Sequence, residues 1–168
     1  MLAGKLLNEA RALRYLIDAL DDEASAEVLF EKGILNRALF HGQQVSEKGS
    51  KACLSMLGIV LADDHKYADF LQKMVVPSSG KLKNEFMKVM VKVSVLETLY
   101  IQSRYGVDKQ GRIHFKEFEK KDVEEVLVSV QRFLELCFLF LEDKLNVQLP
   151  RVKEKLVLYI KTNYKELL

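Results

Sequence analysis

The sequence has only two prolines and two cysteines in 168 residues, and it lacks any apolar run long enough to cross a bilayer. So little proline, with 49% hydrophobic and 30% charged residues, is typical of a globular helical protein and excludes disordered and collagen-like chains. A membrane span takes about 20 apolar residues, whereas the longest run, LCFLFL at 136–141, is short enough to predict a core segment. The charged start of the chain differs from a signal peptide, so we expect a cytoplasmic protein without a membrane anchor.

Cysteine and histidine are too sparse for a metal site. Cys53 and Cys137 lie far apart, without Cys-x-x-Cys spacing, and stand in apolar helical surroundings that predict buried free thiols. The three histidines are isolated from one another and provide no zinc-ligand spacing. We therefore predict no bound metal and no cofactor.

The net charge is also small, because 26 cations balance 24 anions to a formal charge of +2. A charge this low does not by itself indicate nucleic-acid binding. Any phosphate-binding function must therefore depend on where the cations lie.

Apolar residues recur at spacings of three and four throughout, which predicts an all-α chain folded as an up-and-down helical bundle. The first helix is either one rod ending near Gly33 or two helices broken near Asp21 and Asp22. The later helices are predicted at about 34–58, 64–75, 82–105, 120–145 and from Pro150 to the end, with loops at 76–81 and 106–119. We expect a single domain over 1–168, in which 146–168 form an additional C-terminal helix on a four-helix core.

The second predicted helix has small residues along one narrow face. At about 100° per residue, that face comprises Ala38, Gly42, Val45, Gly49, Ala52 and Met56. A glycine inside a helix costs about 1 kcal/mol relative to alanine. We therefore predict that another helix packs closely against this face.

A polar stripe runs beside the small face and consists of Arg37, His41, Gln44, Lys48 and Lys51. Lysine and arginine suit phosphate oxygens, and His41 and Gln44 are able to hydrogen-bond a base or a ribose. The alternative interpretation is a solvated helix face on which Lys51 only pairs with Glu47. A ligand-binding stripe predicts that removing Lys48 and Lys51 weakens binding and leaves the melting temperature nearly unchanged.

Two tyrosines flank Arg104 at the end of the fourth predicted helix. Tyr100 and Tyr105 are able to offer a stacking face to a base, although such residues are also common in cores and interfaces. We add Tyr100 and Arg104 to the stripe as candidate ligand-binding residues.

Three short motifs occur in a characteristic order: FHGQQVSEKGSKA from residue 40, a helix start at His65, and YIQSRY from residue 100. In order and spacing they resemble the HEPN domain family, over about residues 6–145. The resemblance implies a helical bundle that forms a homodimer and binds a nucleotide or RNA. It also implies a minimal nucleotidyltransferase as a partner, in a toxin–antitoxin-type pair.

Ribonuclease members of that family use an Arg-x(4–6)-His motif, in which arginine stabilises phosphate charge and histidine activates a ribose hydroxyl. This chain departs from it, because nine residues separate Arg104 from His114, three separate Arg37 from His41, and one separates Arg112 from His114. The departure favours a binding module over an enzyme. One alternative is a divergent, metal-independent endoribonuclease with Arg104 and His114 as catalytic residues. A second is a structural partner protein without a ligand.

The fourth and fifth predicted helices carry apolar residues on more than one face, and a single four-helix core cannot cover all of them. We therefore predict a homodimer. The residues concerned are Met87, Met90, Val91 and Val93, and Cys137, Phe138, Phe140 and Leu141.

Overall fold

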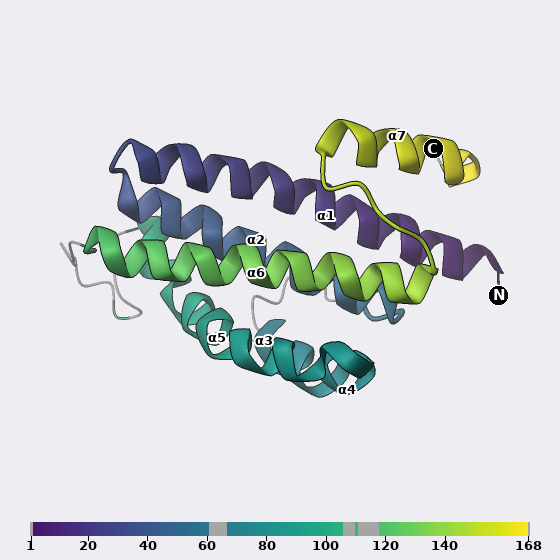
Figure 1. The fold of residues 1–168 in the computed structure, drawn as a ribbon, viewed down its shortest axis with the longest axis horizontal. Helices are drawn as coiled ribbons and strands as arrows, with labels where there is room; N and C mark the ends of the chain where they lie inside the picture. The colour runs from purple at the N-terminus through teal and green to yellow at the C-terminus, as the bar shows by residue number, and fades with distance from the viewer. Residues whose placement is uncertain (1, 61–66, 106–109, 111–117, 168) are drawn as a thin grey trace.

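A computed structural model describes residues 2–60, 67–105, 110 and 118–167, with side chains for all of these except 2–3 and 98–105. The described residues form helices and no strand, which confirms the all-α prediction (Figure 1). The helices are α1 (Leu2–Glu31), α2 (Leu35–Met56), α3 (Tyr67–Phe70), α4 (Val76–Ser78), α5 (Lys83–Tyr105), α6 (Lys120–Leu145) and α7 (Lys153–Asn163). A π-helical turn covers Leu71–Val75, and 3-10 turns cover Gly80–Leu82 and Lys165–Leu167. None of the described helices is long and apolar enough to span a membrane.

The element boundaries confirm one predicted alternative and correct the sequence predictions in two places. α1 is one rod without a break near Asp21 and Asp22, as the first alternative predicted, and it ends before Gly33, whose φ of 74° only glycine adopts easily. The predicted loop at 76–81 is wrong, because the helical run from Tyr67 continues through α4 to Ser78 and a 3-10 turn follows at Gly80–Leu82. The last helix begins at Lys153 rather than Pro150 and ends at Asn163.

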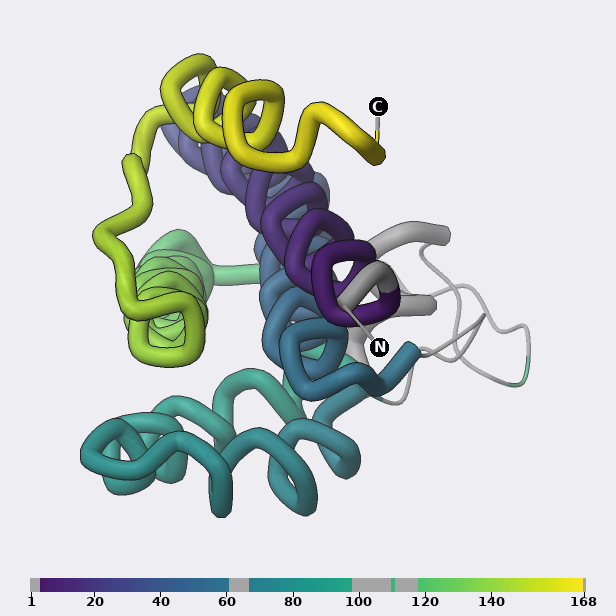
Figure 2. The backbone as a smooth tube through the Cα atoms, turned by 90° about the vertical axis from the view of Figure 1, so that its right-hand side faces the viewer, coloured from purple at the N-terminus to yellow at the C-terminus, as the bar shows by residue number. Residues whose placement is uncertain are grey.

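The long helices alternate in direction along the chain, as expected for an up-and-down bundle (Figure 1). α2 is central, because it packs against α1, α5 and α6. α7 lies along α1 on the side away from α5 (Figure 2). The polar stripe therefore belongs to a helix that packs against three other long helices.

The small face of α2 packs against α6, which confirms the predicted close helix contact. A Cβ atom added at Gly42 would lie 3.0 Å from Leu127 Cδ2. One added at Gly49 would lie 3.1 Å from both Cys137 Sγ and Phe133 Cε1. The two glycines let the α2 and α6 backbones approach each other.

The core is apolar and is formed by α1, α2, α5 and α6, together with residues of α3 and the π-helical turn. It includes every residue of the predicted core segment 136–141 except the half-buried Leu139. Cys53 and Cys137 are buried free thiols, as predicted. Burial raises the pKa of the Cys137 thiol, and the neighbouring Cys53 raises it further, so Cys137 remains protonated.

The same burial corrects part of the homodimer prediction. Phe138 and Phe140 are fully covered within the chain, so α6 leaves no apolar surplus at these positions. On α5, by contrast, Met87 is 55% exposed and Val91 is 68% exposed. Among the residues on which the homodimer prediction depends, the exposed apolar side chains are therefore Met87 and Val91 of α5.

α7 is attached to the bundle by Arg151 and Leu156. The Arg151 guanidinium donates to both carboxylate oxygens of Glu135 and of Glu142, and it stacks 4.5 Å from the centre of the Phe138 ring. Leu156 is the buried residue of α7. Arg151 thus holds the connection before α7 on α6, and α7 itself packs on α1.

Candidate functional site

The polar stripe of α2 lies where α1 and α2 meet, and α1 contributes a residue to it. Asp22 is only 8% exposed, and both of its carboxylate oxygens are bonded to α2. Asp22 Oδ1 lies 2.7 Å from His41 Nδ1, and Asp22 Oδ2 accepts a hydrogen bond from Lys48 Nζ. We call Asp22, His41 and Lys48 the Asp22 cluster. Two members of the predicted stripe are thus held by one buried carboxylate.

The other end of the stripe forms a second cluster, which comprises Gln43, Gln44, Glu47 and Lys51. Buried Glu47 accepts hydrogen bonds from Lys51 Nζ at 2.8 Å and from Gln43 Nε2 at 3.2 Å. Gln44 Nε2 in turn donates to Gln43 Oε1 at 2.6 Å. The Lys51–Glu47 pair of the alternative interpretation is present, but its carboxylate is buried instead of solvated. We call this group the Glu47 cluster.

α3 and α5 contact α2 on the side of the Glu47 cluster. Burial raises the pKa of the Tyr67 hydroxyl, and the carboxylates of Glu97 and Glu47 also raise it, so Tyr67 stays protonated. Glu97 on α5 accepts a hydrogen bond from the Ala68 N–H at 2.7 Å. This side of α2 therefore combines amides, carboxylates and a neutral phenol.

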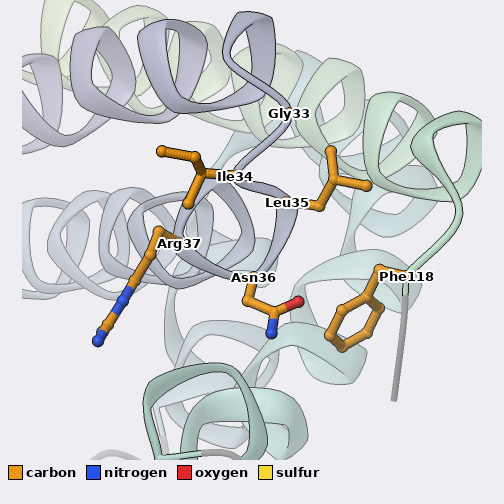
Figure 3. A pocket seen from close by; sticks show the side chains of 6 residues that line it. All are labelled: Gly33, Ile34, Leu35, Asn36, Arg37 and Phe118. Atoms are coloured by element: carbon orange, nitrogen blue, oxygen red, sulfur yellow. The ribbon is translucent and has the colours of Figure 1, made fainter. Parts of the chain in front are cut away.

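Arg37, at the start of the stripe, is exposed and makes no hydrogen bond or ion pair within the described structure. It lines a cavity of about 520 Å³ at the turn between α1 and α2, together with Gly33, Ile34, Leu35, Asn36 and Phe118. Figure 3 shows its side chain extending away from Phe118. Arg37 is therefore available to a ligand outside that cavity.

The remaining candidates cannot be placed in this geometry. Tyr100 and Arg104 lie on α5, and their side chains are outside the described residues, as are His65 and His114. Within the described part of the chain, no group of three or more His, Cys, Asp or Glu residues could hold a metal ion. The structure thus brings together His41 and Lys48, and separately Gln44 and Lys51.

A family model described as "HEPN domain" matches residues 12–144 of the chain. The chain belongs to the HEPN domain family. The match starts within α1 and ends at the last turn of α6, so it leaves out α7. These limits lie close to the predicted 6–145.

A relative from Methanocaldococcus jannaschii carries the name "Putative toxin MJ1304". It is 27% identical to this HEPN chain over 135 residues, which cover 77% of the chain and 88% of the relative. Nearly the whole relative therefore aligns with the helical bundle.

Asp22 is the site residue that sequence reasoning missed. The turn at Gly33 could have indicated it. When a short turn joins two antiparallel helices, residues at similar distances before and after the turn lie opposite each other. Asp22 precedes Gly33 by eleven residues, and His41 follows it by eight. A search of α1 for an acidic partner to the α2 cations could have found it.

Proposed function

We propose that this chain is the HEPN-type binding module of a toxin–antitoxin-type pair and that it binds a nucleotide or an RNA phosphate in a groove beside α2. The observation that carries the proposal is the polar stripe, whose side chains are held in defined positions by the buried carboxylates of Asp22 and Glu47. Positioned donors on a rigid helix bind an anionic ligand at lower entropic cost than freely rotating surface lysines. The relative named as a toxin supports the toxin–antitoxin context.

The partner we propose is a minimal nucleotidyltransferase in the cytoplasm. Residues 1–168 would act as one unit, with 146–168 as an addition to the HEPN-like core. The alternative of a metal-independent endoribonuclease with Arg104 and His114 gains support from the name of the relative. A single experiment separates it from the binding module.

The experiment measures binding and cleavage of RNA by the purified protein in EDTA. A fluorescent, unstructured RNA and a fluorescent adenosine monophosphate are titrated at two salt concentrations, and the RNA is then run on a gel. We expect binding that weakens with salt. For a single strand, each phosphate contact contributes about 0.7 to the slope of log affinity against log salt concentration. We also expect uncut RNA.

RNA that is cut by the wild type and left intact by Arg104→Ala would establish the ribonuclease in place of the binding module. Binding of neither probe at low salt would favour the structural partner without a ligand.

We also propose a homodimer formed through the outer face of α5. Met87, Val91 and Val95 follow one another at i, i+4 and i+8 on this face, and each is at least 45% exposed. A shallow cavity of about 190 Å³ lies beside Met87 and Val91. Exposed apolar residues in one contiguous row mark an interaction surface more often than scattered ones do.

Val91→Lys is expected to convert the dimer to a monomer, because it places a charge in the middle of the apolar row. Light scattering coupled to size exclusion should give about twice 19.3 kDa for the wild type and 19.3 kDa for the variant. Val128→Lys is the matched control, since Val128 is 60% exposed on α6, away from this row. A monomeric wild type at micromolar concentration would refute the proposed dimer.

A further inference from the structure

The charges of the stripe are unevenly available to a ligand. Lys48 is paired with Asp22 and Lys51 with Glu47, so each lysine contributes little net positive charge. Arg37 has no partner within the described structure. His41 forms its hydrogen bond through Nδ1, and its Nε2 makes no hydrogen bond within the described part of the chain. Arg37 and His41 therefore provide the available donors of the stripe, one helical turn apart.

Asp22 fixes how His41 presents its free nitrogen. A carboxylate that accepts a hydrogen bond from Nδ1–H fixes the ring orientation, and when the ring carries both protons its Nε2–H donates to a ligand oxygen. Lys48 balances the charge of Asp22 through the second carboxylate oxygen, which reduces repulsion of an anion. The Phe40 ring, with its centre 5.2 Å from that of His41, limits ring rotation further.

His41 lines a groove of about 750 Å³ formed by three helices. α1 contributes Asp21, Ala24, Ser25, Val28 and Leu29, α2 contributes His41, and α7 contributes Lys153. Asp21 is neutralised by Lys153, whose Nζ lies 2.7 Å from both carboxylate oxygens. Val28 is 55% exposed and provides an apolar floor. The size is within the roughly 300–1,000 Å³ of small-ligand sites.

We propose that this α1–α2–α7 groove is where the ligand binds, with Arg37 and His41 Nε2 on a phosphate group and the attached base against Val28. Asp22 is a positioning residue. The inference rests on the proposed function and names its site. The ligand chemistry is a phosphate that carries a base, supplied either by a free mononucleotide or by an RNA chain. Lys153 belongs to the C-terminal helix, which lies beyond the family match, so this helix also contributes to the proposed site.

The test titrates adenosine monophosphate and a short unstructured RNA into the wild type, Arg37→Gln and His41→Gln. Each variant is expected to bind about ten-fold more weakly or worse, because a charge-assisted hydrogen bond to phosphate is lost. The melting temperature of Arg37→Gln is expected to stay unchanged, because Arg37 has no hydrogen bond or ion pair to lose within the described structure. Arg14→Gln is the control, as an exposed cation on α1 outside the groove. Weaker binding of both probes identifies a mononucleotide site, and weaker binding of the RNA alone identifies an RNA site.

Side-chain nitrogen spectra test the positioning role of Asp22. In the wild type without ligand, Nδ1 of His41 should carry a proton, and the Nε2 resonance should move to that of a protonated nitrogen when adenosine monophosphate is added, because Nε2 has to donate to the phosphate. In Asp22→Asn both ring tautomers should be populated, an effect that a general loss of stability does not produce. If Arg37→Gln and His41→Gln bind both probes as the wild type does while Arg104→Gln weakens binding, the groove is not the site and the proposed function still stands. If the wild type binds neither probe, both proposals fail.

Discussion

Gly49→Leu is expected to unfold or aggregate the protein at 37 °C. The glycine faces two buried groups on α6, and an added Cβ alone would lie 3.1 Å from Cys137 Sγ and from a Phe133 ring carbon. Both neighbours are fully buried, so they have no room to move away. Overpacking a core by a few atoms costs about 1–3 kcal/mol, and leucine adds more than that at a helix contact. Far-UV circular dichroism measures the loss of helical structure, and a thermal melt measures the loss of stability.

Alanine substitutions separate the packing effect from helix propensity. Gly49→Ala is expected to lower the free energy of unfolding, because the clash outweighs the gain of about 1 kcal/mol in propensity. Gly42→Ala meets the end of a half-buried side chain, Leu127 Cδ2 at 3.0 Å, which has room to rotate. It is therefore expected to be neutral or stabilising. Equal melting temperatures for the two alanine variants would contradict the close contact of α2 with α6.

The α2–α6 contact was predictable from sequence because glycine has a known cost in a helix. Gly42 and Gly49 fall on one face, and only a close neighbour compensates for two such residues there. The partner helix was not predictable, since several apolar helices could have packed there. Pro77 shows the opposite case, because proline usually ends a helix, whereas the helical run from Tyr67 passes through a π-helical turn and continues one residue beyond Pro77. Local sequence does not show that the run continues.

The candidate site was also predictable only in part, because the sequence shows which residues share a helix face but not which residues they contact. Helical periodicity showed that Arg37, His41 and Lys48 share a face, but not what faces them. That depends on the register of α1 against α2, which the packing of the whole hairpin sets. The structure therefore leaves Arg37 and His41 available and assigns Lys48 to a buried ion pair. A charged stripe read from sequence overestimates the charge that a ligand meets.

Lys48→Met is expected to destabilise the protein, contrary to the sequence expectation of a nearly unchanged melting temperature. The substitution leaves the carboxylate of Asp22, which is 8% exposed, with His41 as its remaining partner. Breaking a buried pair costs about 3–5 kcal/mol. Because the Lys48 side chain is 29% exposed, we expect about 2–3 kcal/mol here. At about 2–4 °C per kcal/mol, the melting temperature falls by roughly 5–10 °C.

Asp22→Asn together with Lys48→Met should recover most of that stability, because the double variant contains neither unpaired charge. Urea unfolding of the four proteins in this cycle measures the coupling between the two residues directly. Lys5→Met is the control, since Lys5 pairs with Glu9 at 3.8 Å with its side chain 77% exposed, and such pairs contribute about 0–1 kcal/mol. If Lys48→Met melts like the wild type, Lys48 is a solvated cation. It would then be free to contact phosphate, and the ligand site would extend along the whole stripe instead of ending at His41.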